Sequence, residues 1–87
     1  MTETWLKVGA TVFVRGNNDH YVGRITAILP GQVVALEDAS WVANSGRLSE
    51  FCKNGKAESM EVEPVGRIVQ SWDGIIEWPH KLFTKAV

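Results

Sequence analysis

Residues 11–36 read TVFVRGNNDHYVGRITAILPGQVVAL, and this stretch indicates the fold class more strongly than any other part of the chain. Three runs within it are rich in β-branched and aromatic residues or alternate between apolar and polar positions: Thr11–Arg15, His20–Leu29 and Gln32–Leu36. Gly16 to Asp19 and Pro30-Gly31 separate these runs and carry the residue types that favour tight turns. The pattern predicts a three-stranded meander whose third strand ends at Glu37-Asp38.

A short helix is predicted after the meander. Leu48, Phe51 and Cys52 are spaced three and four residues apart, which places them on one face of a helix. Asn44-Ser45-Gly46 offers an N-cap before this stripe, and Asn54-Gly55 offers a left-handed C-cap after it. Residues 38–43 are compatible with two structures, a fourth strand that carries Trp41 or a bend that leads into the helix.

The last third of the chain again has the pattern of strands. Three further strands are predicted, and they cover Ser59–Glu63, Arg67–Trp72 and Ile75–Trp78. We expect Pro64 to stop the first of them, because proline lacks the N–H that a ladder needs. Asp73-Gly74 is a favoured hairpin dipeptide and predicts that the last two strands pair with each other. The tail from His80 to Val87 contains Leu82 and Phe83, and we expect these to dock on the fold.

These elements fit one domain that spans residues 1–87. The fold class we expect is α+β and mostly β, either a small bent antiparallel sheet or an SH3- or Sm-like partial barrel with one short helix. Hydrophobic residues make up 45% and charged residues 22% of the 87 residues, which is an ordinary globular composition.

The compartment we expect is the cytoplasm. No apolar run approaches the ~20 residues that cross a bilayer, so we predict no membrane association. Lys7 is not followed by an apolar stretch, so we also expect no secretory signal. The single cysteine, Cys52, has no partner for an intrachain disulfide, which favours a reducing compartment.

The residues that could carry catalysis are sparse. Cys52 would need a neighbouring base to act as a nucleophile, and the two histidines, His20 and His80, are far from it in sequence. No metal-ligand spacing organises these three residues, and no glycine-rich phosphate loop is present. We therefore expect a protein that is not an enzyme and that uses no metal or other cofactor.

The four tryptophans are the most informative excess in the composition. A core this small has few sites for full-sized aromatic side chains, and tryptophan and arginine are frequent anchors of protein interfaces. The predicted partner-binding residues are Trp41, Asn44, Arg47, Trp72 and Trp78. The alternative is that Trp41 closes the barrel and that Arg47 pairs with Asp38 or Glu50.

Direct nucleic-acid binding is a second hypothesis. Arg15 and Arg24 flank the first turn, and together with Tyr21 they could form one face on which single-stranded RNA stacks. The net charge of −1 disfavours this hypothesis, because non-specific nucleic-acid binders carry an excess of positive charge.

Four segments resemble an uncharacterised family of small phage and prophage proteins. They are VALEDASWV at residues 34–42, SGRL at 45–48, EVEP at 61–64 and DGIIEWPH at 73–80. The resemblance implies a small accessory protein that a mobile element makes inside a bacterium. This setting is similar to that of anti-CRISPR and other anti-defence inhibitors, so the expected partner is a host protein or ribonucleoprotein complex. A phage structural or assembly component is the alternative, and association into a homodimer is left open.

Overall fold

The computed structural model describes residues 5–16 and 19–86 and contains one five-stranded antiparallel sheet with one short helix. The elements in chain order are β1 (Thr11–Arg15), β2 (His20–Leu29), β3 (Val33–Ala43), α1 (Leu48–Asn54), β4 (Glu61–Ser71) and β5 (Gly74–Glu77). Across the sheet the order is β4-β3-β2-β1-β5. The expectation of a mostly β fold built on a meander is confirmed, since β1, β2 and β3 pair in succession.

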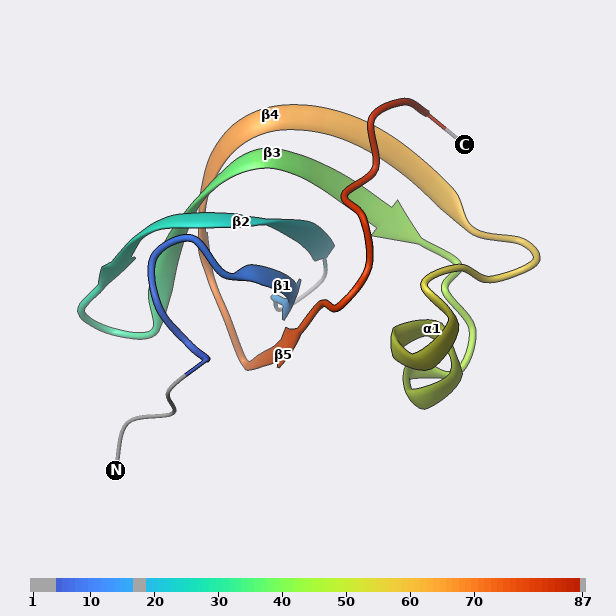
Figure 1. Cartoon of the computed structure of the whole chain (residues 1–87), viewed down its shortest axis with the longest axis horizontal. Coiled ribbons are helices and arrows are strands. Elements are labelled where there is room, and N and C mark those ends of the chain that lie inside the picture. Colours follow the sequence, from blue (N-terminus) through green and yellow to red (C-terminus); the bar gives the residue numbers. More distant parts are fainter. Residues whose placement is uncertain (1–4, 17–18, 87) are drawn as a thin grey trace.

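The sheet is strongly bent, because the chain passes directly from one edge strand to the other. Only Trp72 and Asp73 separate the end of β4 from the start of β5. The N–H of Trp72 donates to the carbonyl of Gln32 at 3.0 Å, and that of Asp73 donates to the carbonyl of Arg15 at 2.8 Å. The two edges therefore approach each other at this end, and the sheet curls into an open, barrel-like shape (Figure 1).

The predicted hairpin at Asp73-Gly74 is wrong. β5 pairs with β1, where Ile76 lies opposite Phe13 and Ile75 opposite Val14, and the sheet order keeps it away from β4. A dipeptide that suits a tight turn does not settle which strand the following segment joins. β5 pairs with the free edge of β1 because this pairing packs Ile75 against one hydrophobic cluster and Ile76 against another.

The third strand does not end at Glu37-Asp38 as predicted. Asp38 adopts a left-handed backbone with φ of 50°, and the register with β2 and β4 shifts around it. The irregularity is a β-bulge, which bends a strand without ending it. β3 therefore runs on to Ala43 and carries Trp41 within it, which resolves the ambiguity of residues 38–43 in favour of a strand.

Pro64 does not interrupt the fourth strand either. The two strands predicted on either side of it are one strand, β4, so that the sheet has five strands and not six. β4 lies at an edge of the sheet, where proline is tolerated. Gly66, with φ of 84°, lies opposite Ala39 at the bulge and lets both strands bend together.

Two hydrophobic clusters lie on opposite faces of β1. Val12 and Val14 belong to the first, which also contains the buried residues Ile25, Val34, Leu36 and Ala39. Phe13 points the other way into the second cluster, which also contains Val22, Val42, Phe51, Val62 and Trp78. Because successive side chains of a strand alternate between faces, β1 can serve both clusters, and all three of its central residues are fully buried.

The helix α1 packs beneath one end of β3 and β4 through Phe51, which is buried in the second cluster (Figure 1). The left-handed C-cap at Gly55, φ 76°, is confirmed, and of the predicted stripe Phe51 is buried and Leu48 packs against the second cluster. The predicted N-cap at Asn44-Ser45-Gly46 is wrong, because Arg47 occupies the N-cap position without a side-chain hydrogen bond.

Over the described ranges, no helix combines the length and the apolar character that crossing a bilayer requires.

Candidate functional site

Trp78 is part of the core. Its side chain is 1% exposed, and its ring centroid lies 5.0 Å from that of Phe51 and 6.1 Å from that of Phe13. Its indole N–H donates to the carbonyl of Lys81 at 3.3 Å. The prediction that Trp78 contacts a partner is therefore corrected, because the C-terminal segment and α1 already cover this side chain.

Trp72 occupies an intermediate position. It lies in the link between β4 and β5 and packs against the first hydrophobic cluster. Its indole nitrogen is buried and has no hydrogen-bond partner among the described residues. Much of the ring therefore serves the closure of the bent sheet, and only its remaining surface is available to a partner.

Trp41 differs from both of these tryptophans. It is partly buried and lies near the C-terminal end of β3. It belongs to neither of the two hydrophobic clusters found among the described residues. Its Cα is opposite Tyr21 on β2 and Glu63 on β4, and its indole N–H donates to the Asp19 carboxylate at 3.4 Å. Trp41 is thus a partly exposed residue of the sheet, with Tyr21 and Glu63 as its neighbours on the adjacent strands.

Tyr21 is the closest aromatic neighbour of Trp41 in the strand register. It is partly buried and packs against the first cluster, so its ring has a supported position. Partial burial, with a smaller contribution from the Asp19 carboxylate, raises the pKa of the Tyr21 phenol above its ordinary value. The raised pKa keeps the Tyr21 phenol neutral at physiological pH, so that no charge is placed opposite Trp41 on β2.

Asn44 and Arg47 follow Trp41 along the chain and are both exposed. Asn44 has a left-handed backbone, with φ of 56°, which turns the chain away from β3 toward α1. Both residues line a hollow of about 350 Å³ together with Glu50 of α1 and Lys56 of the following loop. The ion pairs found among the described residues do not include Arg47, so the predicted alternative of a pair with Asp38 or Glu50 is not observed.

A second groove, of about 690 Å³, runs between the C-terminal segment and the bulge of β3 and β4. Leu82 and Phe83 provide apolar wall on one side, and Ala39 and Pro64 do so on the other. The predicted docking of the tail is confirmed, because Leu82 and Phe83 also pack against the second cluster. The sequence did not indicate this groove, because its walls come from segments that are far apart in the chain.

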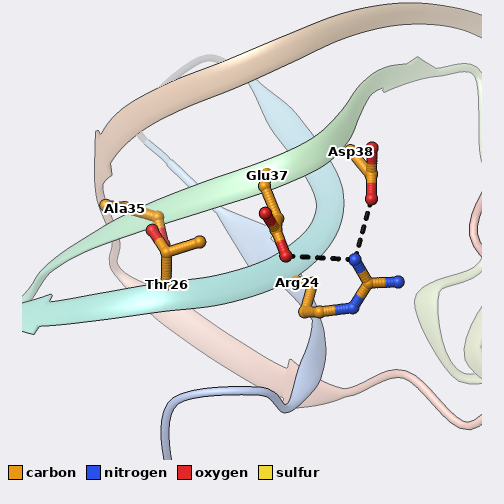
Figure 2. Close-up of polar contacts among 5 residues, drawn as sticks. All are labelled: Arg24, Thr26, Ala35, Glu37 and Asp38. Carbon is orange, nitrogen blue, oxygen red and sulfur yellow. Dashed lines mark hydrogen bonds and ion pairs between the residues drawn. The ribbon is translucent and has the colours of Figure 1, made fainter.

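Arg24 stands at the rim of this groove. Its guanidinium lies between two carboxylates, 3.2 Å from Glu37 and 2.7 Å from Asp38 (Figure 2). Hydrogen bonds to Asp38 and then to Glu37 raise the pKa of Arg24 above its ordinary value. The left-handed bulge at Asp38 places two consecutive acidic residues where both can reach the same arginine.

Arg15, Tyr21 and Arg24 do not form the single face that the RNA hypothesis requires. In the register of β1 and β2, Tyr21 is opposite Val14, whereas Arg15 is opposite His20. Arg15 therefore points to the opposite face of the sheet from Tyr21. Arg24 lies on the face opposite Tyr21 as well, and its guanidinium is engaged by two carboxylates.

Cys52 and His80 are nearer to each other than the sequence indicated. The Nε2–H of His80 donates to the backbone carbonyl of Cys52 at 2.7 Å. Burial raises the pKa of the Cys52 thiol, which lowers the fraction of reactive thiolate at neutral pH. In residues 5–16 and 19–86, no three histidine, cysteine, aspartate or glutamate side chains are placed to share a metal ion.

Comparison with known proteins adds no relative to this description. No protein-family model, curated protein or solved structure matches the chain.

Proposed function

We propose that this chain is a small non-enzymatic binding protein that acts by occupying the surface of a partner protein or ribonucleoprotein complex. The observation that carries the proposal is the position of Trp41, a large and partly exposed aromatic residue of β3 that belongs to neither hydrophobic cluster of the described residues. Tryptophan is among the residues that contribute most to protein interfaces. The exposed residues Asn44 and Arg47 extend the proposed binding segment from the end of β3 to the start of α1.

The biological setting that we propose is the cytoplasm of a bacterium that carries a phage or prophage. This part rests on the resemblance of residues 34–42, 45–48, 61–64 and 73–80 to small phage and prophage proteins. A small protein in that setting can serve as an inhibitor of the anti-CRISPR or anti-defence type, which blocks a host complex by covering its working surface. Such a role needs a binding face and no catalytic group.

The experiment is an affinity purification of the tagged chain from bacterial lysate, with and without nuclease, followed by mass spectrometry. We expect a stoichiometric protein partner that survives nuclease and that the Trp41→Ala and Arg47→Glu variants no longer capture. Arg67→Glu is the matched control, because Arg67 is also an exposed arginine but lies on β4. The thermal melting of each variant confirms that it is folded.

Each outcome has a defined meaning. A nuclease-resistant partner that belongs to a defence complex supports the inhibitor role. Recovery that disappears with nuclease would instead favour a nucleic-acid-binding protein. Capture of a second copy of this chain alone, with self-association in sedimentation measurements, would favour a phage structural component. Loss of the partner from the Arg67→Glu protein but not from the Trp41→Ala protein would place the binding face elsewhere.

A further inference from the structure

The strand register places two aromatic and several acidic residues on one face of the sheet. Tyr21, Trp41 and Glu63 are directly opposite one another on β2, β3 and β4. Two residues further along, Ala43 lies opposite Glu61, so that this pair points to the same side. Glu61 and Glu63 are exposed, whereas Tyr21, Trp41 and Ala43 are partly buried.

Asp19 completes the acidic border of this face. It is exposed, precedes Tyr21 by two residues, and accepts the hydrogen bond from the indole of Trp41. None of the residues named on this face, which are Asp19, Tyr21, Trp41, Ala43, Glu61 and Glu63, is a lysine or an arginine. The nearest arginine in the register of β1 and β2, Arg15, points to the other side. Tyr21 and Trp41 therefore share this side of the sheet with three carboxylates, one from Asp19 and two from β4.

An aromatic surface of this kind has a preferred ligand. The face of an indole or phenol ring attracts cations, and the attraction is largest for tryptophan. Carboxylates beside the ring add charge-assisted hydrogen bonds to a guanidinium or ammonium group. The same three carboxylates repel the phosphates of a nucleic acid, which makes RNA and DNA poor ligands for this face.

From this juxtaposition we infer that the face takes a basic protein segment, with an arginine or lysine side chain against Trp41 and Tyr21 and among the carboxylates of Asp19, Glu61 and Glu63. The inference rests on the proposed binding function and names the chemistry of its partner.

A titration with a short peptide of alternating glycine and arginine tests this inference. The readout is the indole N–H resonance of Trp41 in a proton–nitrogen NMR spectrum, identified by its loss in the Trp41→Leu variant. We expect the peptide to shift this resonance and the backbone amides of Tyr21 and Glu63, and to leave the indole of buried Trp78 unchanged. Added salt is expected to weaken binding, because the contacts are exposed to solvent.

Two variants separate the contributions. Trp41→Leu is expected to weaken binding of the peptide by roughly two- to fivefold, which is the typical contribution of an exposed cation–π contact. The Glu61→Lys/Glu63→Lys protein is expected to weaken it by about tenfold or more, because like charges then face each other. The matched control is Asp73→Lys/Glu77→Lys, which changes the net charge equally but replaces exposed residues outside both this face and the hollow at Asn44 and Arg47. Glu61→Gln/Glu63→Gln provides a milder change if the charge reversal affects folding.

The inference is overturned if the face variants and the charge-matched control bind the arginine peptide equally. It is also overturned if the Trp41 indole does not respond, or if it responds as strongly to a glycine–glutamate peptide or a single-stranded oligonucleotide. A lysate partner that is lost from the Trp41→Ala protein but retained by the Glu61→Lys/Glu63→Lys protein would overturn only the basic character of the partner. A wild-type chain that captures no partner would overturn the proposed function itself.

Discussion

The imidazole of His80 lies against the C-terminal end of α1, where its Nε2–H donates a 2.7 Å hydrogen bond to the carbonyl of Cys52. The helix has seven residues, and a helix of this length is not stable in isolation. It is held by Phe51 in the second cluster and by this contact with the C-terminal segment. His80 also packs against Trp78, with ring centroids 5.0 Å apart, so one residue connects the helix, the core and the tail.

We therefore expect His80→Ala to lower the free energy of unfolding by about 1–2 kcal/mol, because the carbonyl of Cys52 loses its donor in a partly buried site. The measurement is chemical denaturation followed by tryptophan fluorescence. Lys81→Ala is the control and should stay within about 0.5 kcal/mol of the wild-type chain, since Lys81 is exposed and contributes only its carbonyl to Trp78. Equal effects of the two substitutions would contradict a structural role for the His80 imidazole.

The two glycines that flank the helix provide a second test. Gly46 and Gly55 both have left-handed backbones, with φ of 71° and 76°. A Cβ at Gly46 would meet nothing within 4 Å, whereas a Cβ at Gly55 would come within 2.8 Å of the His80 ring. Gly46→Ala is expected to cost about 1–2 kcal/mol from backbone strain alone. Gly55→Ala should cost clearly more in the same denaturation measurement.

The double variant Gly55→Ala/His80→Ala identifies the source of that difference. Removing the imidazole removes the atom that the new methyl group would meet. When Gly55→Ala is introduced into the His80→Ala protein, the loss in the free energy of unfolding should therefore be smaller and close to that caused by Gly46→Ala. If it does not, backbone strain at Gly55, and not contact with His80, accounts for the effect.

The contrast between Trp78 and Trp41 predicts losses of stability of very different size. Trp78→Ala is expected to cost about 3–5 kcal/mol, because it removes a fully buried ring that contacts Phe13 and Phe51. Small domains have about 5–15 kcal/mol of total stability, so this variant should be largely destabilised or unfolded. Trp41→Ala should cost about 1 kcal/mol or less and keep a cooperative thermal transition. A Trp41→Ala protein that unfolds would show that Trp41 is structural.

His20 predicts how stability depends on pH. Burial, and then the positive charge of Arg15, lower the pKa of His20 below its ordinary value of 6.5, against a smaller opposite effect of Asp19. The unfolded chain therefore binds a proton at His20 more readily than the folded chain does. The contribution of His20 to the free energy of unfolding is therefore present above the pKa that His20 has in the unfolded chain. It is lost as the pH falls from that value toward the lower pKa that His20 has in the folded chain.

The corresponding measurement is denaturation of the wild-type chain and the His20→Gln variant at neutral pH and at about pH 5. The wild-type chain should lose more stability on acidification than the variant does. The ring of His20 also contacts Phe13, so the variant is compared with itself across pH and not only with the wild-type chain. An identical pH dependence of the two proteins would contradict the lowered pKa.

Local signals in the sequence were sufficient for β1, β2, the turn at Pro30-Gly31 and the left-handed cap at Gly55. These features depend on alternation, on β-branched and aromatic residues, and on glycine at positions of positive φ, and each acts over a few residues. The predicted turn from Gly16 to Asp19 agrees with the hydrogen bond from the Gly16 N–H to the Asp19 carbonyl, while Asn17 and Asn18 lie outside the described residues.

The errors at Asp38, Pro64 and Asp73-Gly74 share one physical reason. Each of these residues has a strong local preference, for a turn or against a strand, and each lies where pairing with a distant strand outweighs it. Asp38 and Pro64 remain within strands because the neighbouring strands continue past them and the bulge absorbs the misfit. Asp73-Gly74 directs β5 to β1 because that strand offers the free edge and the buried faces.

The same distinction separates the tryptophans, on which the candidate site depends. The sequence identified them as an excess for so small a core and indicated Trp41, Trp72 and Trp78 alike as partner-binding residues. It could not assign Trp78 to the interior and Trp41 to the surface, because a tryptophan has the same intrinsic preferences in both places. Burial is decided by which elements pack together: α1, β1 and the C-terminal segment meet over Trp78, whereas on β2 to β4 the face of Trp41 carries Tyr21 and exposed glutamates.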